Sequence, residues 1–456
     1  MAGLSVAHRI ALTQLLDAVP DRMLRQLTLM AAGMSGDKAR AFEVLIAEAG
    51  IDRVRRGRAL ATLEPLFQQR ADGVEATTFP PGVFGRLWRM ASAEQIDMLP
   101  LLDERDDRKA GQASAVCTRI CQAAATAVRD QPDLLWPSCE GEDHEAREGA
   151  LEELARCCDL GALMQKALPA LPAWVGRPNE NQLAELRILI RDSASMAPDG
   201  ARRLLDILFA HLADASLILR LVVHASDAAQ HESFLRQSEL AVFVERLLDA
   251  VEIRTERTQA FRPGQPLDGL KADLAWMAET LGELDTTLNL QPDSVWGKRT
   301  HDARRRVSDV LTSVLVSAER AVDRALPMER VQTAGRMTRS MPMLSRPVDP
   351  DIRKTAEDIL TVIGAIRTLA GAFGCEARRH EVTDALKLRL IDYADLALEE
   401  INAGDVGDED VALARVMMAA GFLERIEAGP EARAVRRRAA VAGGPPVLAR
   451  PSAAAA

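Results

Sequence analysis

Five of the six cysteines in this chain lie between positions 117 and 158, with one histidine among them. Thiolate and imidazole groups gathered in this way are the ligands that Zn²⁺ and iron–sulfur clusters prefer. Cys117 and Cys121 are four residues apart and therefore share a face of a predicted helix. A helical hairpin would bring the vicinal Cys157 and Cys158 alongside that face. The candidate metal ligands are Cys117, Cys121, Cys139, His144, Cys157 and Cys158.

The same cysteines also fit an apolar core. Cys117, Cys121, Ala124 and Val128 form one apolar stripe at helical spacing, and the chain has no Cys-x-x-Cys motif. A free cysteine behaves in such a stripe as a small buried hydrophobe. We therefore interpret the cysteines as core residues and predict no cofactor. A zinc or iron–sulfur site in the 117–158 region remains the alternative.

A second motif is the pair His301-Asp302, placed on a predicted helix. This pair resembles the metal-binding His-Asp pair of the HD-type phosphohydrolases, which are all-helical. The resemblance covers these two residues and implies a metal-dependent phosphohydrolase as a second alternative function. The chain has no phosphate-binding loop, no nucleophile elbow and no dinucleotide fingerprint. These absences favour a non-enzymatic protein.

One stretch, Arg330–Arg346, combines cations and methionines without any acidic residue. Adaptable Met side chains beside cations are typical of segments that bind partner helices or membrane surfaces. We interpret the stretch as a linker between helices. The alternative is a binding segment for an acidic partner or an anionic membrane surface. Its candidate binding residues are Arg330, Arg336, Met337, Arg339, Met341, Met343 and Arg346.

The composition sets the protein class. The formal net charge of −10 argues against a nucleic-acid-binding protein, because such proteins need a basic face. No window holds the roughly 20 uncharged apolar residues of a membrane span, and no secretory signal is visible at the start. We therefore expect a cytoplasmic protein with reduced thiols. Of the 57 cations only 7 are Lys, a preference that we associate with GC-rich bacterial genomes.

Helix-period apolar spacing runs through nearly the whole chain, and the chain has one Tyr among 456 residues. These features predict an all-α fold. Up to residue 262, Pro, Gly and capping residues punctuate the sequence into short helices, with a sub-boundary at 71–82. We expect irregular helical hairpins there, similar to an α-solenoid.

Longer helices are predicted in the second part, at 268–288, 293–325, 351–372, 376–403 and 408–426. They indicate an antiparallel helical bundle over residues 267–428. Residues 429–456 are rich in Arg, Ala, Pro and Gly, and we predict a disordered basic tail there. The interpretation that follows is a helical scaffold or adaptor that binds other proteins through helical surfaces.

Overall fold

The structure is a computed structural model of the chain. It describes residues 5–19, 21–103, 110–138, 143–165, 167, 175, 179–225, 232–332 and 338–442. Contacts between residues divide the chain into two compact units. Unit 1 comprises Met1–Ala250 and Glu283–Leu290, and unit 2 comprises Val251–Gly282 and Gln291–Ala456.

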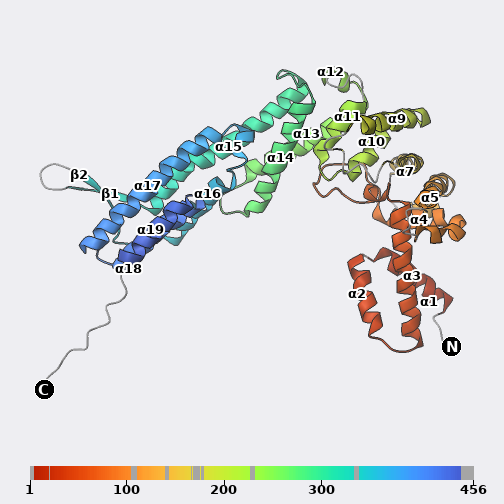
Figure 1. The fold of residues 1–456 in the computed structure, drawn as a ribbon, viewed down its shortest axis with the longest axis horizontal. Coiled ribbons are helices and arrows are strands. Elements are labelled where there is room, and N and C mark those ends of the chain that lie inside the picture. The colour runs from red at the N-terminus through yellow and green to blue at the C-terminus, as the bar shows by residue number, and fades with distance from the viewer. Residues whose placement is uncertain are drawn as a thin grey trace. The chain divides into compact units, whose positions relative to one another are not determined.

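Unit 1 consists of helices joined by turns (Figure 1). Its α-helices are α1 (Val6–Ala18), α2 (Asp21–Ala32), α3 (Asp37–Ala59), α4 (Pro81–Ser92), α5 (Ala110–Asp130), α6 (Pro132–Leu135), α7 (His144–Met164), α9 (Glu180–Met196), α10 (Gly200–His211), α11 (Ile218–Ala225) and α12 (Glu232–Leu235). Its 3₁₀ helices are η1 (Glu64–Phe67), η2 (Ala93–Leu102) and η5 (Ala215–Leu217). The predicted all-α class is confirmed.

Two helices, α13 (Ala241–Ala260) and α14 (Leu267–Thr287), contribute residues to both units. The predicted boundary at residue 262 falls in the turn between them. Within α13 the contacts assign residues up to Ala250 to unit 1 and the remainder of the helix to unit 2.

The first three helices enclose a small core of their own in unit 1. Both α1 and α2 pack against α3. The buried side chains of this core are Leu16, Leu24, Ala31, Leu45, Ile46 and Ala49. From α3 the Arg53 guanidinium also donates a hydrogen bond of 2.6 Å to the Leu16 carbonyl at the end of α1. This core is therefore small, and much of the surface of each of the three helices remains exposed to solvent.

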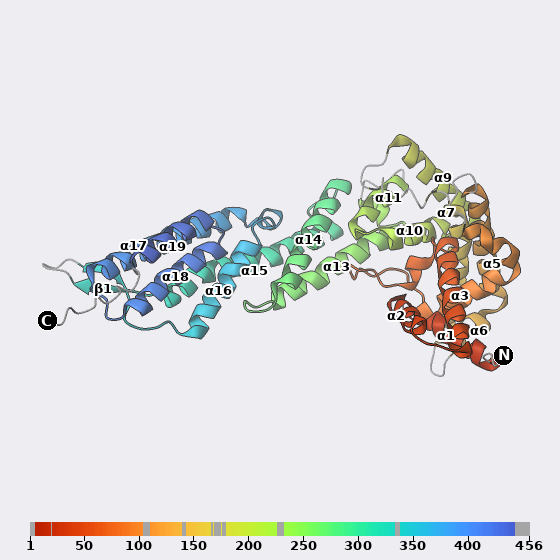
Figure 2. The same cartoon turned by 60° about the horizontal axis from the view of Figure 1, so that its bottom comes forward.

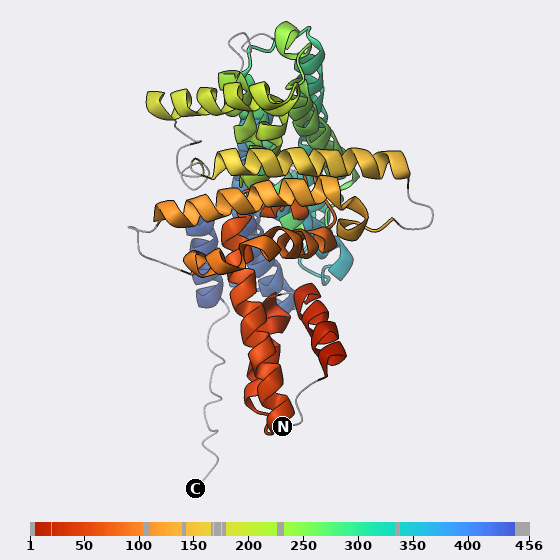
Figure 3. The ribbon, with the colours of Figure 1, turned by 90° about the vertical axis from the view of Figure 1, so that its right-hand side faces the viewer.

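Helices α5 and α7 lie side by side in unit 1, as Figure 3 shows in orange and yellow. The N-cap of α7 is Asp143, whose carboxylate accepts hydrogen bonds from the backbone N–H groups of Glu145 and Ala146. This cap fixes where α7 begins and hence which of its residues face α5. The predicted helical hairpin around the cysteines is thus present.

Unit 2 is a bundle of long helices. Beyond its part of α13 and α14 it contains α15 (Val295–Ala325), α16 (Pro350–Ala365), the 3₁₀ helix η6 (Ala370–Phe373), α17 (Glu376–Ala403), α18 (Glu409–Arg425) and α19 (Gly429–Ala442). Figure 2 shows α17, α18 and α19 alongside one another. Their facing stripes form one apolar core with α15 and α16, which includes Leu315, Leu360 and Phe422. Four of the five predicted ranges match their helices within two residues, whereas α16 ends at Ala365, seven residues before the predicted end.

The prediction of a disordered tail from residue 429 is wrong for residues 429–442. They form α19, whose Ala432, Val435 and Ala439 are buried in the bundle core. Ion pairs fix its exposed side, with Arg436 Nη2 at 2.5 Å from Glu424 Oε2 and Arg438 paired with Asp395. The basic residues therefore lie on the exposed side of a helix that packs on the bundle. Residues 443–456 lie outside the described residues.

A short β-hairpin interrupts the helices between α15 and α16. Strands β1 (Met328–Gln332) and β2 (Thr338–Pro342) pair antiparallel, with Arg330 opposite Ser340. A linker was predicted here. The backbone N–H and C=O groups of this segment form their hydrogen bonds across the two strands, whereas in a helix they would form them within one segment. None of the described helices is both long enough and apolar enough to cross a lipid bilayer.

Candidate functional site

Four of the candidate cysteines lie on two helices that pack against each other, α5 and α7. Cys117 and Cys121 lie on α5, and Cys157 and Cys158 lie on α7, with all four thiols buried and reduced. The Cys121 thiol donates a hydrogen bond of 3.7 Å to the Ala59 carbonyl, and Gln165 Nε2 lies 3.5 Å from Cys121 Sγ. Cys139, the fifth candidate, lies outside the described residues. The thiols are thus sealed between helices.

Burial controls the acidity of these thiols. Desolvation raises the pKa of Cys121 from its ordinary 9.0 to about 11. Burial also raises the pKa of Cys157 and of Cys158, and for Cys158 the neighbouring Cys121 adds to the effect. A cysteine nucleophile must be a thiolate. These thiols are protonated at neutral pH, which is the state of a core residue.

The remaining candidate ligand is distant from the thiols. His144 is exposed in the first turn of α7, 13 residues before Cys157. Thirteen residues of α-helix correspond to about 20 Å along the axis. Among the described residues there is no group of three or more His, Cys, Asp or Glu side chains that could hold a metal ion. The described cysteines and His144 therefore do not converge on one point.

We predict that the buried thiols are unreactive in the folded protein. With a pKa of about 11, only about a thousandth of Cys121 is thiolate at pH 8. In a Cys139→Ser variant the other five thiols, all buried, should react with a disulfide reagent only after unfolding in urea. Fast reaction of two or more thiols in the absence of urea would show that the cysteine region opens and would contradict the core interpretation.

The pair that resembles the HD-type phosphohydrolases lies on the surface of α15. His301 is exposed, and the Asp302 carboxylate forms an ion pair of 2.5 Å with Arg305 one turn further on. No other His or Asp of the described chain joins them in a metal-binding group. The pair occupies a solvated helix face.

The Arg330–Arg346 stretch includes β2 and the last three residues of β1. Arg339 Nη2 lies 2.9 Å from Glu399 of α17, and Arg415 of α18 donates to the backbone carbonyl of Arg346 at 2.6 Å. Met341 and Met343 are half-buried, whereas Arg330 is exposed. Arg336 and Met337 lie outside the described residues. Part of this stretch therefore anchors the hairpin to the bundle.

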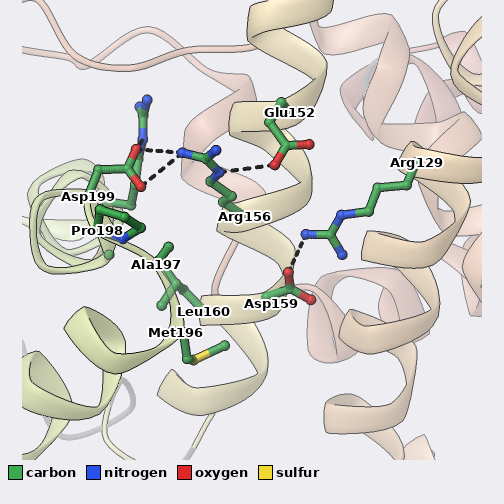
Figure 4. A pocket seen from close by; sticks show the side chains of 11 residues that line it. Arg129, Glu152, Arg156, Asp159, Leu160, Met196, Ala197, Pro198 and Asp199 are labelled. Carbon is green, nitrogen blue, oxygen red and sulfur yellow. Dashed lines mark hydrogen bonds and ion pairs between the residues drawn. The ribbon is translucent and has the colours of Figure 1, made fainter.

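One hollow of unit 1 lies between α5, α7, α9 and α10, with a volume of about 300 Å³. Figure 4 shows its ion pairs. Arg129 lies 2.5 Å from Asp159, and the Arg156 guanidinium bridges Glu152 and Asp199 at 3.0 and 2.9 Å. The lining arginines Arg129, Arg156 and Arg203 are matched by the carboxylates Glu152, Asp159 and Asp199.

This balance defines the chemistry of the hollow. Because three cations face three carboxylates, the hollow has no excess charge to attract an ion. Its lining residues include no Cys, His or Ser that could act as a nucleophile or base. Gly200 brings α10 against α9, since a side chain there would collide with the Ser193 carbonyl. The ion pairs that line the hollow connect the helices that surround it.

A second hollow of unit 1, of about 530 Å³, contains His211 at the end of α10. Its Nε2 atom lies 3.0 Å from the Thr62 carbonyl oxygen and donates a hydrogen bond to it. Burial lowers the pKa of His211, so its ring is neutral at pH 7. A neutral imidazole held by a backbone carbonyl is a structural hydrogen bond that joins α10 to the segment after α3.

Exposed apolar side chains gather on α2. Met23, Leu29 and Met30, which we call the α2 face, are exposed, with Leu29 at 77% and Met30 at 67%. Met23 and Met30 are seven residues apart and share one side of the helix. Leu24 and Ala31 on the adjoining side are buried against α3. The apolar sector of α2 is therefore wider than the part that α3 covers.

Helix α3 also has more apolar side chains than its packing covers. Leu45, Ile46 and Ala49 enter the N-terminal core, while Val44, Ile51 and Val54 are exposed. We call these three residues the α3 stripe. With the exposed Ala47 they follow the three- and four-residue spacing of a coiled-coil seam. The sequence analysis missed both surfaces, although the second apolar stripe of α3 is legible in the sequence.

Comparison with known proteins gives no relative of this chain. No protein-family model, no curated protein sequence and no solved structure matches it.

Proposed function

We propose that this protein is a scaffold or adaptor of the bacterial cytoplasm that binds other proteins through its helical surfaces. The observation that carries the proposal is the pair of unpartnered apolar surfaces on α2 and α3. Eight of the exposed large apolar side chains fall within residues 15–54: Leu15, Met23, Leu29, Met30, Met34, Val44, Ile51 and Val54. Concentrated apolar exposure of this kind marks protein-binding surfaces.

The energetics favour helix recognition. Each square ångström of apolar surface removed from water contributes about 25 cal/mol, so covering several Met, Leu, Ile and Val side chains supplies several kcal/mol. A partner helix with anchors at positions i, i+3, i+4 and i+7 has the matching geometry. Methionine side chains adapt to partners of different shape. The protonated cysteines and the charge-balanced hollow offer no comparable support for a metal-dependent or hydrolytic function.

Affinity capture with quantitative mass spectrometry tests the proposal. We expect the full chain to recover a defined partner set that is lost at least tenfold in Met23→Glu/Met30→Glu or Val44→Glu/Ile51→Glu variants. These residues are exposed, so circular dichroism of the variants should match that of the wild type. Leu388→Glu is the matched control, because Leu388 of α17 is 65% exposed and lies outside both surfaces. Equal recovery by all variants would refute the proposal.

A further inference from the structure

Cations outnumber carboxylates around the α2 face. From the start of α2 to Arg40 there are four cations, Arg22, Arg25, Lys38 and Arg40, and two carboxylates, Asp21 and Asp37. The segment has a net charge of +2, whereas the chain has −10. All four cations are exposed. No ion pair is recorded for any of them within the described part of the chain.

The cations adjoin the apolar side chains. Arg22 and Arg25 precede Leu29 by seven and four residues, so all three lie on one side of α2. Met23 and Met30 form the neighbouring row. The exposed part of α2 is therefore a narrow apolar seam bordered by guanidinium groups. A matching partner presents an apolar row bordered by carboxylates.

We propose that the α2 face binds an acidic amphipathic helix of a partner protein. This inference rests on the proposed scaffold function and specifies the chemistry of one partner. The apolar row of that helix packs on Met23, Leu29 and Met30, and its Asp or Glu side chains meet Arg22 and Arg25. Charge complementarity of this kind gives specificity and fast association.

Two other occupants fit the face less well. A second copy of the chain in a two-fold arrangement would bring two identical faces of positive charge together, which is repulsive. A membrane-surface helix immerses a broad apolar face in the lipid. Here Leu24 and Ala31 are already buried against α3, and only the seam is free. A single partner helix needs no more than this seam.

The test is a selection from a library of displayed helical peptides with randomised surface positions, using the immobilised full chain. We expect the wild type to enrich peptides with apolar residues at i, i+3, i+4 and i+7 and with flanking Asp or Glu. Affinity of an enriched peptide, measured by fluorescence anisotropy, should fall about tenfold in Arg22→Glu/Arg25→Glu and also fall between 50 and 300 mM salt. A charge-reversed variant should in turn enrich basic peptides. Lys354→Glu, an exposed cation of α16, is the charge control.

The outcomes separate the two proposals. Enrichment that Met30→Glu abolishes, but that shows no acidic bias, leaves the scaffold function standing and refutes the acidic helix. Peptides that bind the Met30→Glu variant equally well refute both. Two further results would also overturn the inference. One is Met30-dependent binding to phosphatidylglycerol vesicles without peptide enrichment, and the other is a Met30-dependent dimer in sedimentation.

Discussion

Replacing Asp206 by alanine should destabilise unit 1 by about 3–5 kcal/mol, because it leaves buried arginine charge without its partner. Asp206 on α10 is fully buried. Its Oδ1 atom accepts a 2.7 Å hydrogen bond from Arg246 of α13, and Oδ2 lies 3.8 Å from Arg203. The side chains of Arg203 and Arg246 are only 12% and 15% exposed, so little water reaches this cluster. The cluster depends on its one fully buried carboxylate.

In the Asp206→Ala variant, Arg246 would be the arginine left without a carboxylate partner. Its other contacts are the Thr77 hydroxyl at 3.3 Å and the ring of Phe243, 5.6 Å from the guanidinium carbon. Neither carries a countercharge. Arg203 keeps Asp199 at 3.1 Å and Glu153. Asp206→Asn should cost less than Asp206→Ala, since the amide oxygen still accepts from Arg246.

Urea unfolding, with hydrogen exchange of peptides from α10 as the local probe, measures the loss. A double variant Asp206→Leu/Arg246→Met should recover most of it, because no charge is then left unpaired in the interior. Asp192→Ala is the surface control. Its partner Arg191 lies 3.8 Å away on an exposed side of α9, so the change should stay within about 0.5 kcal/mol. A cost below 1 kcal/mol for Asp206→Ala would show that water hydrates the cluster.

The sequence predicted helices best where caps and long stripes agree. The range 293–325 was expected as a helix, and α15 occupies Val295–Ala325 with the Ser294 hydroxyl accepting from Gly297 N–H. The stripe through Val307, Leu311 and Leu315 is buried. Strong periodicity over about thirty residues leaves little freedom, since any other conformation would expose the stripe.

The α19 segment shows where composition misleads. Its arginines and the Gly429-Pro430 step indicated disorder, yet Pro in the first helical turn is a normal helix start. Ala432, Val435 and Ala439 repeat at three and four residues and are buried. Alanine adds little to a hydrophobicity count, but it lets a helix pack closely on its neighbours. The tertiary contact, rather than local composition, decides the structure here.

Among the candidate sites, too, one feature could be predicted from the sequence and another could not. Helical spacing predicted that Cys117 and Cys121 share a face with Cys157 and Cys158 nearby. Helix α5 does pack on α7 and the four thiols are buried, but among the described residues no three of them form a metal-binding group. The α2 face was missed, because a helix with an apolar stripe is expected to bury all of it. Only the three-dimensional arrangement shows that α3 covers Leu24 and leaves Met30 exposed. Exposure is a property of the tertiary structure.

The buried thiols predict a loss of stability at alkaline pH. In the folded protein burial raises the pKa of Cys121 from 9.0 to about 11, and the pKa values of Cys157 and Cys158 rise as well. In the unfolded chain each thiol ionises near its ordinary value. Between pH 9 and 11 the unfolded state therefore binds fewer protons than the folded state. Stability falls as pH rises through this window, and it is unaffected below pH 8.

The expected size follows from the shift at Cys121. At pH 10 its contribution to the loss is about 1.4 kcal/mol, and the raised pKa values of Cys157 and Cys158 add to the loss in the same direction. The comparison is between urea unfolding of the wild type and of Cys121→Ala at pH 7.5 and pH 10. The alanine variant starts less stable because it leaves a cavity, but it should lose about 1.4 kcal/mol less between the two pH values. The variant comparison also removes the contribution of Tyr393, whose pKa burial raises too. Identical pH dependence in both proteins would mean that Cys121 ionises in the folded state, and the thiols would then be available as metal ligands after all.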